Sequence, residues 1–218
     1  AGIGVGVPGP VNSQGVVSGC VNVGWGTVDV EAELGSLTGF AVKTGNDANV
    51  AALGEMWQGG AKGCKDVIMV TLGTGVGGGI IVDGKVVAGF DGAGGEIGHI
   101  TIDPAEQETC NCGRRGCLEQ YTSATGIVRL AKKKLAADAR ETALRNHEPL
   151  TARDIFDEAK AKDAAALELV DEVCKILGTA LSNIACVVNP EVIVIGGGVS
   201  KAGEILTERV QKYYKEAA

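Results

Sequence analysis

Aromatic residues are scarce in this chain of 218 residues, where phenylalanine, tryptophan and tyrosine together make up only 4%. We therefore expect an aliphatic core, because hydrophobic residues still reach 45%, which is ordinary for a soluble globular protein. Basic residues are too few to balance the acidic ones, and the net charge of −7 argues against nucleic acid or an anionic membrane as a partner. No apolar stretch reaches the roughly 20 residues that a membrane-spanning helix needs.

Histidine is the scarcest of the metal-binding residues, yet one of the two histidines lies close to three cysteines. His99, Cys110, Cys112 and Cys117 fall within nineteen residues. Thiolate and imidazole ligands suit Zn²⁺, whereas Mg²⁺ and Ca²⁺ prefer oxygen. The spacing therefore predicts a tetrahedral structural zinc site with these four ligands, and a disulfide or free thiols is the alternative.

The other cysteines and the second histidine show no such grouping. Cys20, Cys64, Cys174 and Cys186 are scattered among apolar or small residues. This distribution favours a reducing compartment, and we expect a cytoplasmic protein. His147 lies in a polar run, so we expect it to be solvated.

The apolar pattern predicts strands that alternate with helices, which is typical of an α/β protein. Strands are expected at residues 2–7, 41–44, 67–72, 80–82, 85–88 and 191–195. Helices are expected at residues 29–37, 48–57, 123–137, from 151 onwards, at 163–188 and at 202–214. Val16, Val17 and Val21 suggest a hairpin, and Asp83-Gly84 marks a type I′ turn between two strands.

Two glycine-rich turns, at residues 73–79 and 196–198, each follow a predicted strand. The exposed backbone N–H groups of such turns can cradle phosphates, and the hydroxyl of Thr74 can add a hydrogen bond. Neither turn has the lysine of a Walker loop or the dinucleotide-binding spacing. Taken singly, each is explained equally well as a plain hairpin or strand-to-helix turn.

Asn46 and Asp47 lie where a predicted strand gives way to a helix. A carboxylate at this point is well suited to cap the helix, and by itself that is the favoured role of Asp47. Its other reading is a general base that accepts the proton of a sugar hydroxyl during phosphoryl transfer. Such a reaction also needs Mg²⁺ and hydrogen-bond donors around the phosphates.

In combination, these segments resemble the ROK family of sugar kinases and sugar-responsive repressors, and most closely the bacterial ROK-type glucokinases. The matching segments, in the family's order, are Asn46-Asp47-Ala48-Asn49, residues 72–79, residues 95–99, residues 110–119 and residues 195–199. The resemblance implies a ribonuclease H-like, actin-like ATPase fold of two α/β domains around a cleft. Residues 1–64 would be the remainder of an incomplete N-terminal domain, and residues 65–218 a C-terminal domain with the zinc knuckle.

The resemblance also implies a role for each matching residue. Asp47 would be the catalytic base on the 6-hydroxyl of glucose, and the sugar ligands would be Asn46, Glu96, His99 and Glu119. His99 would serve both the sugar and the zinc. The nucleotide-binding residues would be Gly73, Thr74, Gly75, Gly77, Gly78, Gly196, Gly197 and Gly198. The implied substrates are a hexose and ATP with Mg²⁺, and we expect a homodimer because dimers are common in the family.

One family segment is missing. Family members begin with an Asp-x-Gly-Gly-Thr loop that holds phosphate and Mg²⁺, whereas this chain opens without Met on an apolar segment at residues 3–7. We therefore expect a fragment with little kinase activity of its own, in which residues 1 to about 64 are the less stable portion. The alternatives to a glucokinase are a kinase for fructose, mannose or N-acetylmannosamine, the sugar-sensing domain of a ROK repressor, and a zinc-braced domain without activity.

Overall fold

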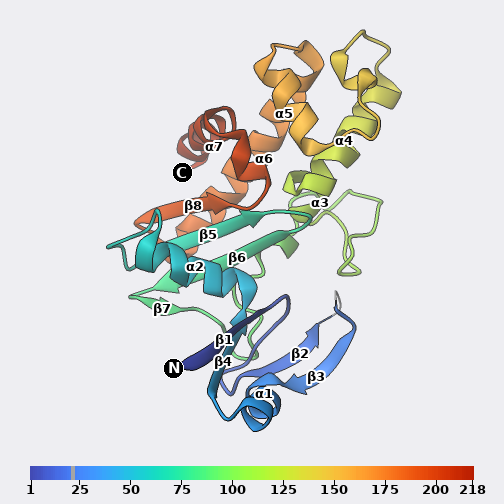
Figure 1. The fold of residues 1–218 in the computed structure, drawn as a ribbon. Helices are drawn as coiled ribbons and strands as arrows, with labels where there is room; N and C mark the ends of the chain where they lie inside the picture. The colour runs from blue at the N-terminus through green and yellow to red at the C-terminus, as the bar shows by residue number, and fades with distance from the viewer. Residues whose placement is uncertain (21–22) are drawn as a thin grey trace. The chain divides into compact units, whose positions relative to one another are not determined.

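The computed structural model describes residues 1–20 and 23–218 of a mixed α/β protein (Figure 1). The chain divides into two compact units, which are described separately. Unit 1 comprises residues 1–70, 78–96 and 190–194, and unit 2 comprises residues 71–77, 97–189 and 195–218. The domain boundary that the sequence favours, between residues 64 and 65, stays a prediction.

Unit 1 contains two small sheets. Its first elements are β1 (Gly2–Val7), β2 (Val16–Cys20), β3 (Trp25–Asp29), α1 (Val30–Thr38) and β4 (Ala41–Asn46). Strand β1 pairs in parallel with β4, and β2 pairs antiparallel with β3. Asp29 caps α1 by accepting a hydrogen bond from the N–H of Ala32. The predicted strands and the hairpin are confirmed, although Val21 lies outside the described residues.

The helix that follows β4 buries small residues. Helix α2 (Asp47–Gln58) buries the small residues Ala48 and Ala52, together with Asn49. Val50, Leu53 and Trp57 are exposed, with Trp57 74% accessible, whereas Met56 is half-buried against the core. Small side chains thus make the buried contacts of this helix.

The largest sheet has four strands in the order β7-β6-β5-β8. They are β5 (Val67–Leu72), β6 (Val76–Val82), β7 (Lys85–Val86) and β8 (Val192–Gly196). The unbroken apolar run of β5 is explained by its burial, since Val67, Ile68 and Val70 are inaccessible. Asp83 and Gly84 both have positive φ, as a type I′ turn requires, and β7 is shorter than the predicted strand.

Unit 2 is mainly helical. Its elements are η2 (Ile97–His99), α3 (Glu119–Thr122), α4 (Ala124–Ala137), η3 (Ala143–Asn146), α5 (Ala152–Lys160), α6 (Ala164–Val188), η4 (Val199–Ala202) and α7 (Glu204–Ala217). Helix α6 packs against α5 and α7 (Figure 1). The predicted caps are confirmed at Ser123, which accepts from Gly126, and at the capping box of Thr151 and Asp154.

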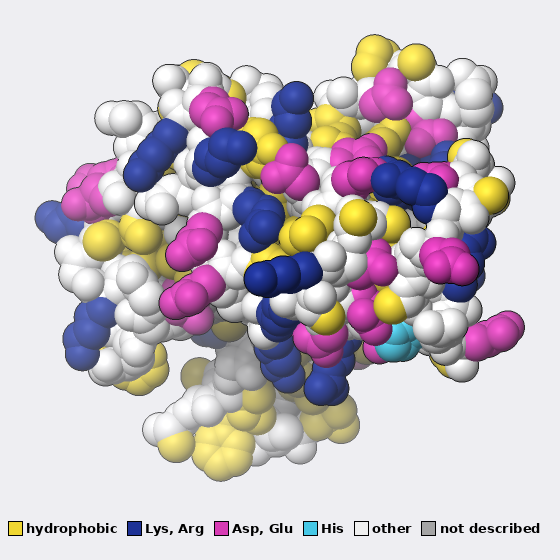
Figure 2. Space-filling model, turned by 90° about the horizontal axis from the view of Figure 1, so that it is seen from above, with side chains coloured by type: hydrophobic (Ala, Val, Ile, Leu, Met, Phe, Trp, Pro, Cys, Tyr) yellow, Lys and Arg dark blue, Asp and Glu magenta, His cyan; other side chains and the backbone are white. Residues whose placement is uncertain are grey.

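Charged side chains on the face seen in Figure 2 are mixed in sign rather than gathered by sign. The ion pairs of the described residues include that between Arg140 and Glu168. His147 is partly exposed, and its Nε2 atom lies 2.7 Å from a carboxylate oxygen of Glu158. In the described part of the chain, no helix is long and apolar enough to cross a membrane.

Candidate functional site

Four predicted metal ligands come together in unit 2. The ligand atoms of His99, Cys110, Cys112 and Cys117, here called the cysteine–histidine cluster, all lie within 4.8 Å of one another. The Sγ atoms of Cys112 and Cys117 are 3.6 Å apart, close to the separation of about 3.8 Å that a tetrahedron with Zn–S bonds of about 2.3 Å requires. All seven cysteines are free thiols. The donor set and spacing therefore fit Zn²⁺.

Glycine makes the close approaches around the cluster possible. A Cβ atom on Gly98 would lie 2.1 Å from the carbonyl oxygen of Val76, so only glycine fits where η2 packs against the start of β6. Gly116 has a φ of +70°, and a Cβ atom there would lie 1.7 Å from the carbonyl oxygen of Asp103. The cluster thus depends on backbone packing that no other residue permits.

The thiols of the cluster differ in their electrostatic surroundings. Burial, followed by hydrogen bonding with Cys112 and Cys110, raises the pKa of Cys117 to about 12. Burial also raises the pKa of Cys112, but the hydrogen bond from the N–H of Arg114 and those from the other thiols lower it overall. A zinc ion would deprotonate such thiols and release their protons.

Glu119 connects the cluster with the first glycine turn. Its Oε2 atom accepts a hydrogen bond of 3.0 Å from the N–H of Val76, and its Oε1 atom lies 3.8 Å from Sγ of Cys110. Glu119 is the first residue of α3, and it is half-buried. A carboxylate held in this way is oriented before any ligand binds.

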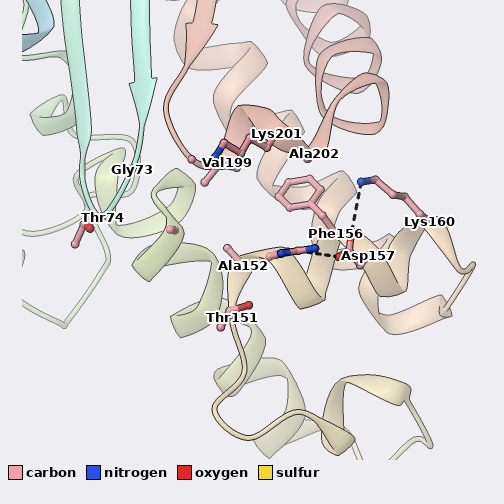
Figure 3. A pocket seen from close by; sticks show the side chains of 13 residues that line it. Gly73, Thr74, Thr151, Ala152, Phe156, Asp157, Lys160, Val199, Lys201 and Ala202 are labelled. Atoms are coloured by element: carbon pink, nitrogen blue, oxygen red, sulfur yellow. Dashed lines mark hydrogen bonds and ion pairs between the residues drawn. The ribbon is translucent and has the colours of Figure 1, made fainter.

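Both glycine turns contribute to one cavity of about 750 Å³ (Figure 3). Gly73 and Thr74 line it from the first turn, and Gly198 lines it from the second. The first turn is fixed to the start of α4, because the N–H of Ala124 donates to the carbonyl oxygen of Gly73 at 2.8 Å. Two turns that are weak signals singly therefore belong to the same pocket.

The other predicted nucleotide ligands are not among the residues that line this cavity. Gly77 and Gly78 belong to β6, Gly196 ends β8, and Gly197 packs against the backbone of Leu72. Gly75 lies against the carboxylate of Glu119.

Helix α5 supplies pocket residues that the sequence analysis does not identify. Phe156 is 2% exposed, and the carboxylate of Asp157 lies 3.4 Å from both Arg153 and Lys160. Lys201 of η4 also lines the cavity (Figure 3). The capping box marks where α5 starts, but nothing in the local pattern shows which of its faces meets a cavity.

The strand end at Asn46 and Asp47 shows which of the two side chains caps α2. Asn46 is the cap of α2, because its Oδ1 atom accepts from the N–H of Asn49 at 3.1 Å. Its Nδ2 atom donates to the carbonyl oxygen of Gly9. Asp47 is exposed, and one carboxylate oxygen accepts from the N–H of Ala48 at 2.8 Å. The capping role weighed for Asp47 is therefore taken by its neighbour.

Glu96 lies in unit 1 at the end of a glycine-rich segment and is half-buried. The preceding Gly95 has a φ of +90°, and a Cβ atom there would lie 2.8 Å from the carbonyl oxygen of Gly78. The backbone that carries Glu96 is therefore packed closely against β6.

The element order and sheets match part of the actin-like ATPase fold. The model of the ROK family matches residues 1–218, and the chain belongs to the ROK family. It is 46% identical over 222 residues to a glucokinase of Halalkalibacterium halodurans, covering 100% of this chain and 67% of that protein.

Two solved structures extend the comparison. One is a ROK family glucokinase from Streptomyces griseus in complex with glucose and AMPPNP, with a TM-score of 0.87 and 32% identity over 99% of this chain and 71% of the other. The second is a ROK family transcriptional regulator, a homologue of the Escherichia coli MLC protein, with a TM-score of 0.91 and 30% identity. The chain covers 55% of that regulator, so it spans between half and three quarters of these relatives.

Proposed function

We propose that the protein transfers the γ-phosphoryl group of ATP to the 6-hydroxyl of glucose. The observation that carries the proposal is that Asn46, and not Asp47, caps the start of α2. Asn46 caps the helix, so the exposed carboxylate of Asp47 is available as a base. The similarity to glucokinases supports glucose as the substrate.

In this proposal Asp47 accepts the proton of the sugar hydroxyl as its oxygen attacks phosphorus. Such general-base catalysis contributes about 10²–10⁴-fold to the rate. Asn46, Glu96, His99 and Glu119 bind the remaining hydroxyls of the sugar. Glu119 suits this role because the N–H of Val76 already holds its carboxylate in place.

The cavity lined by both glycine turns is the proposed ATP site. The backbone N–H group of Thr74 can donate to a phosphate oxygen, whereas that of Gly73 already donates to the carbonyl oxygen of Gly75 at 3.0 Å. Mg²⁺ bound with ATP would neutralise further charge. Phe156 and Val199 line the cavity with apolar side chains, which suit the adenine ring of ATP. The ammonium group of Lys201 adds positive charge that attracts the phosphates of ATP.

The proposed metal of the cysteine–histidine cluster is a structural Zn²⁺. Its four protein ligands fill a tetrahedral site, so the ion would stabilise the fold around Glu119 and His99 rather than activate water. We also propose that the protein works in the reducing cytoplasm, where its thiols remain available to the metal. We further propose that it forms a homodimer.

The substitution Asp47→Asn tests the proposed reaction. In the complete protein, we expect turnover to fall by about 10²-fold or more, with glucose affinity within a few-fold of wild type, because the amide keeps the shape and cannot accept the proton. Asp29→Asn is the matched control, since it also removes an exposed carboxylate at a helix start. Normal turnover in Asp47→Asn would show that Asp47 is not the general base.

A second candidate function is the sugar-sensing domain of a ROK repressor. The TM-score of 0.91 to a ROK transcriptional regulator favours it. A coupled assay with glucose, fructose, mannose and N-acetylmannosamine separates the two functions. Sugar binding without turnover for any of them supports the repressor, and turnover identifies the preferred hexose.

A further inference from the structure

The segment between His99 and Cys110 is flanked by a cluster ligand at each end, and the N–H groups of Ile102 and Asp103 bond it to the carbonyl oxygen of Gly116. Residues 100–109, all described in the structure, contain turns and isolated bridges but no helix or strand. Most of these residues are exposed, so apolar burial contributes little to their position. Polar contacts must therefore fix the segment.

Glu106 is the centre of these polar contacts, and its side chain is only 8% exposed. Its Oε2 atom accepts hydrogen bonds from the hydroxyl of Tyr121 at 2.9 Å and from Nη1 of Arg129 at 2.8 Å. Its Oε1 atom accepts from the N–H of Gln107 at 2.9 Å. A buried carboxylate is stable only with such partners, so they hold Glu106 firmly.

Arg129 extends this contact along α4. Its Nε atom donates to the carbonyl oxygen of Gln120 at 3.1 Å, and Nη1 also reaches Glu108 at 3.0 Å. The guanidinium carbon lies 5.1 Å from the ring centroid of Tyr121, within the range of a cation–π interaction. One side chain thus joins the exposed segment to two helices.

Gln120 carries the connection to the cluster itself. Its buried side chain accepts from the N–H of Cys117 at 3.1 Å and donates to the carbonyl oxygen of Glu108 at 3.0 Å. Glu108 lies two residues before Cys110. Gln120 therefore fixes the backbone of one ligand and the approach to another.

We propose that Glu106, Gln120, Tyr121 and Arg129, here called the bracing network, are positioning residues that hold the cluster ligands in the geometry of the metal. The inference rests on the proposed zinc site. None of the four supplies a ligand atom of the cluster. Their effect is preorganisation, since ligands that are ordered before the ion arrives lose less freedom on binding it.

The test compares two buried tyrosines of unit 2. Tyr121→Phe removes the hydroxyl that lies 2.9 Å from Glu106 and 3.0 Å from Asp103. Tyr213→Phe removes a hydroxyl that donates to Asp171, which is not part of the bracing network. The zinc dissociation constant is measured by competition with a chromophoric chelator. We expect Tyr121→Phe to raise it by about 10–100-fold, as is typical of residues that orient metal ligands, and Tyr213→Phe to leave it unchanged.

A second variant and two further measurements make the outcome decisive. Arg129→Met should also raise the dissociation constant, whereas Arg140→Met should not, because Arg140 pairs with Glu168. If Tyr121→Phe lowers the melting temperature of the zinc-free protein and leaves the zinc constant unchanged, the network is only structural and the inference is wrong. Elemental analysis of the wild-type protein separates the two proposals, since absence of zinc there would overturn the metal site as well.

Discussion

The N–H of Val76 donates a hydrogen bond of 3.0 Å to Oε2 of Glu119. This contact joins the start of β6 to the first turn of α3, and the other oxygen of the carboxylate lies beside Cys110. One acidic side chain is therefore shared by the glycine turn and the cysteine–histidine cluster. A substitution at Glu119 can be chosen so that Val76 and Cys110 keep their positions.

Glu119→Gln should raise the Michaelis constant for glucose by about tenfold or more while zinc remains bound. The amide oxygen can still accept from Val76, but it loses the stronger hydrogen bond that a charged acceptor makes with a sugar hydroxyl. Steady-state kinetics and zinc content are measured together, with the exposed Glu141→Gln as control. An unchanged constant across several hexoses would place the sugar elsewhere.

Cys112→Ser should abolish stoichiometric zinc binding and lower the melting temperature. The hydroxyl is a poor substitute for a thiolate, and three ligands leave the tetrahedron open. Elemental analysis should give about one zinc per wild-type chain, and Cys186→Ser, at an exposed cysteine outside the cluster, should match the wild type. Wild-type protein without zinc contradicts this prediction.

Ala202→Trp should raise the Michaelis constant for ATP by about tenfold or more, a loss of about 1.4 kcal/mol. The indole would occupy part of the cavity lined by both glycine turns, whereas the cluster is untouched. Kinetics with varied ATP and varied glucose separate the two effects. Ala217→Trp, at the end of α7, is the control, and equal constants in both variants would exclude this cavity as the ATP site.

Glu106→Gln should reduce the loss of the free energy of unfolding that occurs as the pH is lowered. Burial raises the pKa of Glu106, but hydrogen bonds from the N–H of Glu108, from Arg129 and from Tyr121 outweigh it and bring the pKa to about 2. A lowered pKa stabilises the fold above the ordinary value of 4.5, and this contribution is lost as the pH falls towards 2. Urea unfolding of the zinc-free protein at about pH 5 and pH 3 measures it. Wild type and Glu141→Gln should lose stability in this range more steeply than Glu106→Gln.

Local chemistry made much of the fold predictable. Ser123 and Thr151 cap helices through side chains that bond only three residues ahead, so the signal lies within one turn. The cluster was also predictable, because three of its ligands lie within eight residues. Short-range patterns of this kind need no knowledge of the tertiary structure.

Which of Asn46 and Asp47 caps the helix was harder to predict from the sequence. Both residue types cap helices well, and a shift of one position decides which side chain remains available. Phe156 and Lys201 were missed for another reason. They approach the first glycine turn only through the packing of α5 and η4, and no local pattern records that packing.

Gly98 and Gly116 have a consequence for mutational tolerance. Neither residue offers a side chain to a metal or a substrate, yet a single methyl group at either position would overlap a backbone carbonyl oxygen. In a saturation library selected for metal retention, these two sites should accept as few residues as the cysteines do. The least tolerant positions in such a library should therefore include two without functional groups.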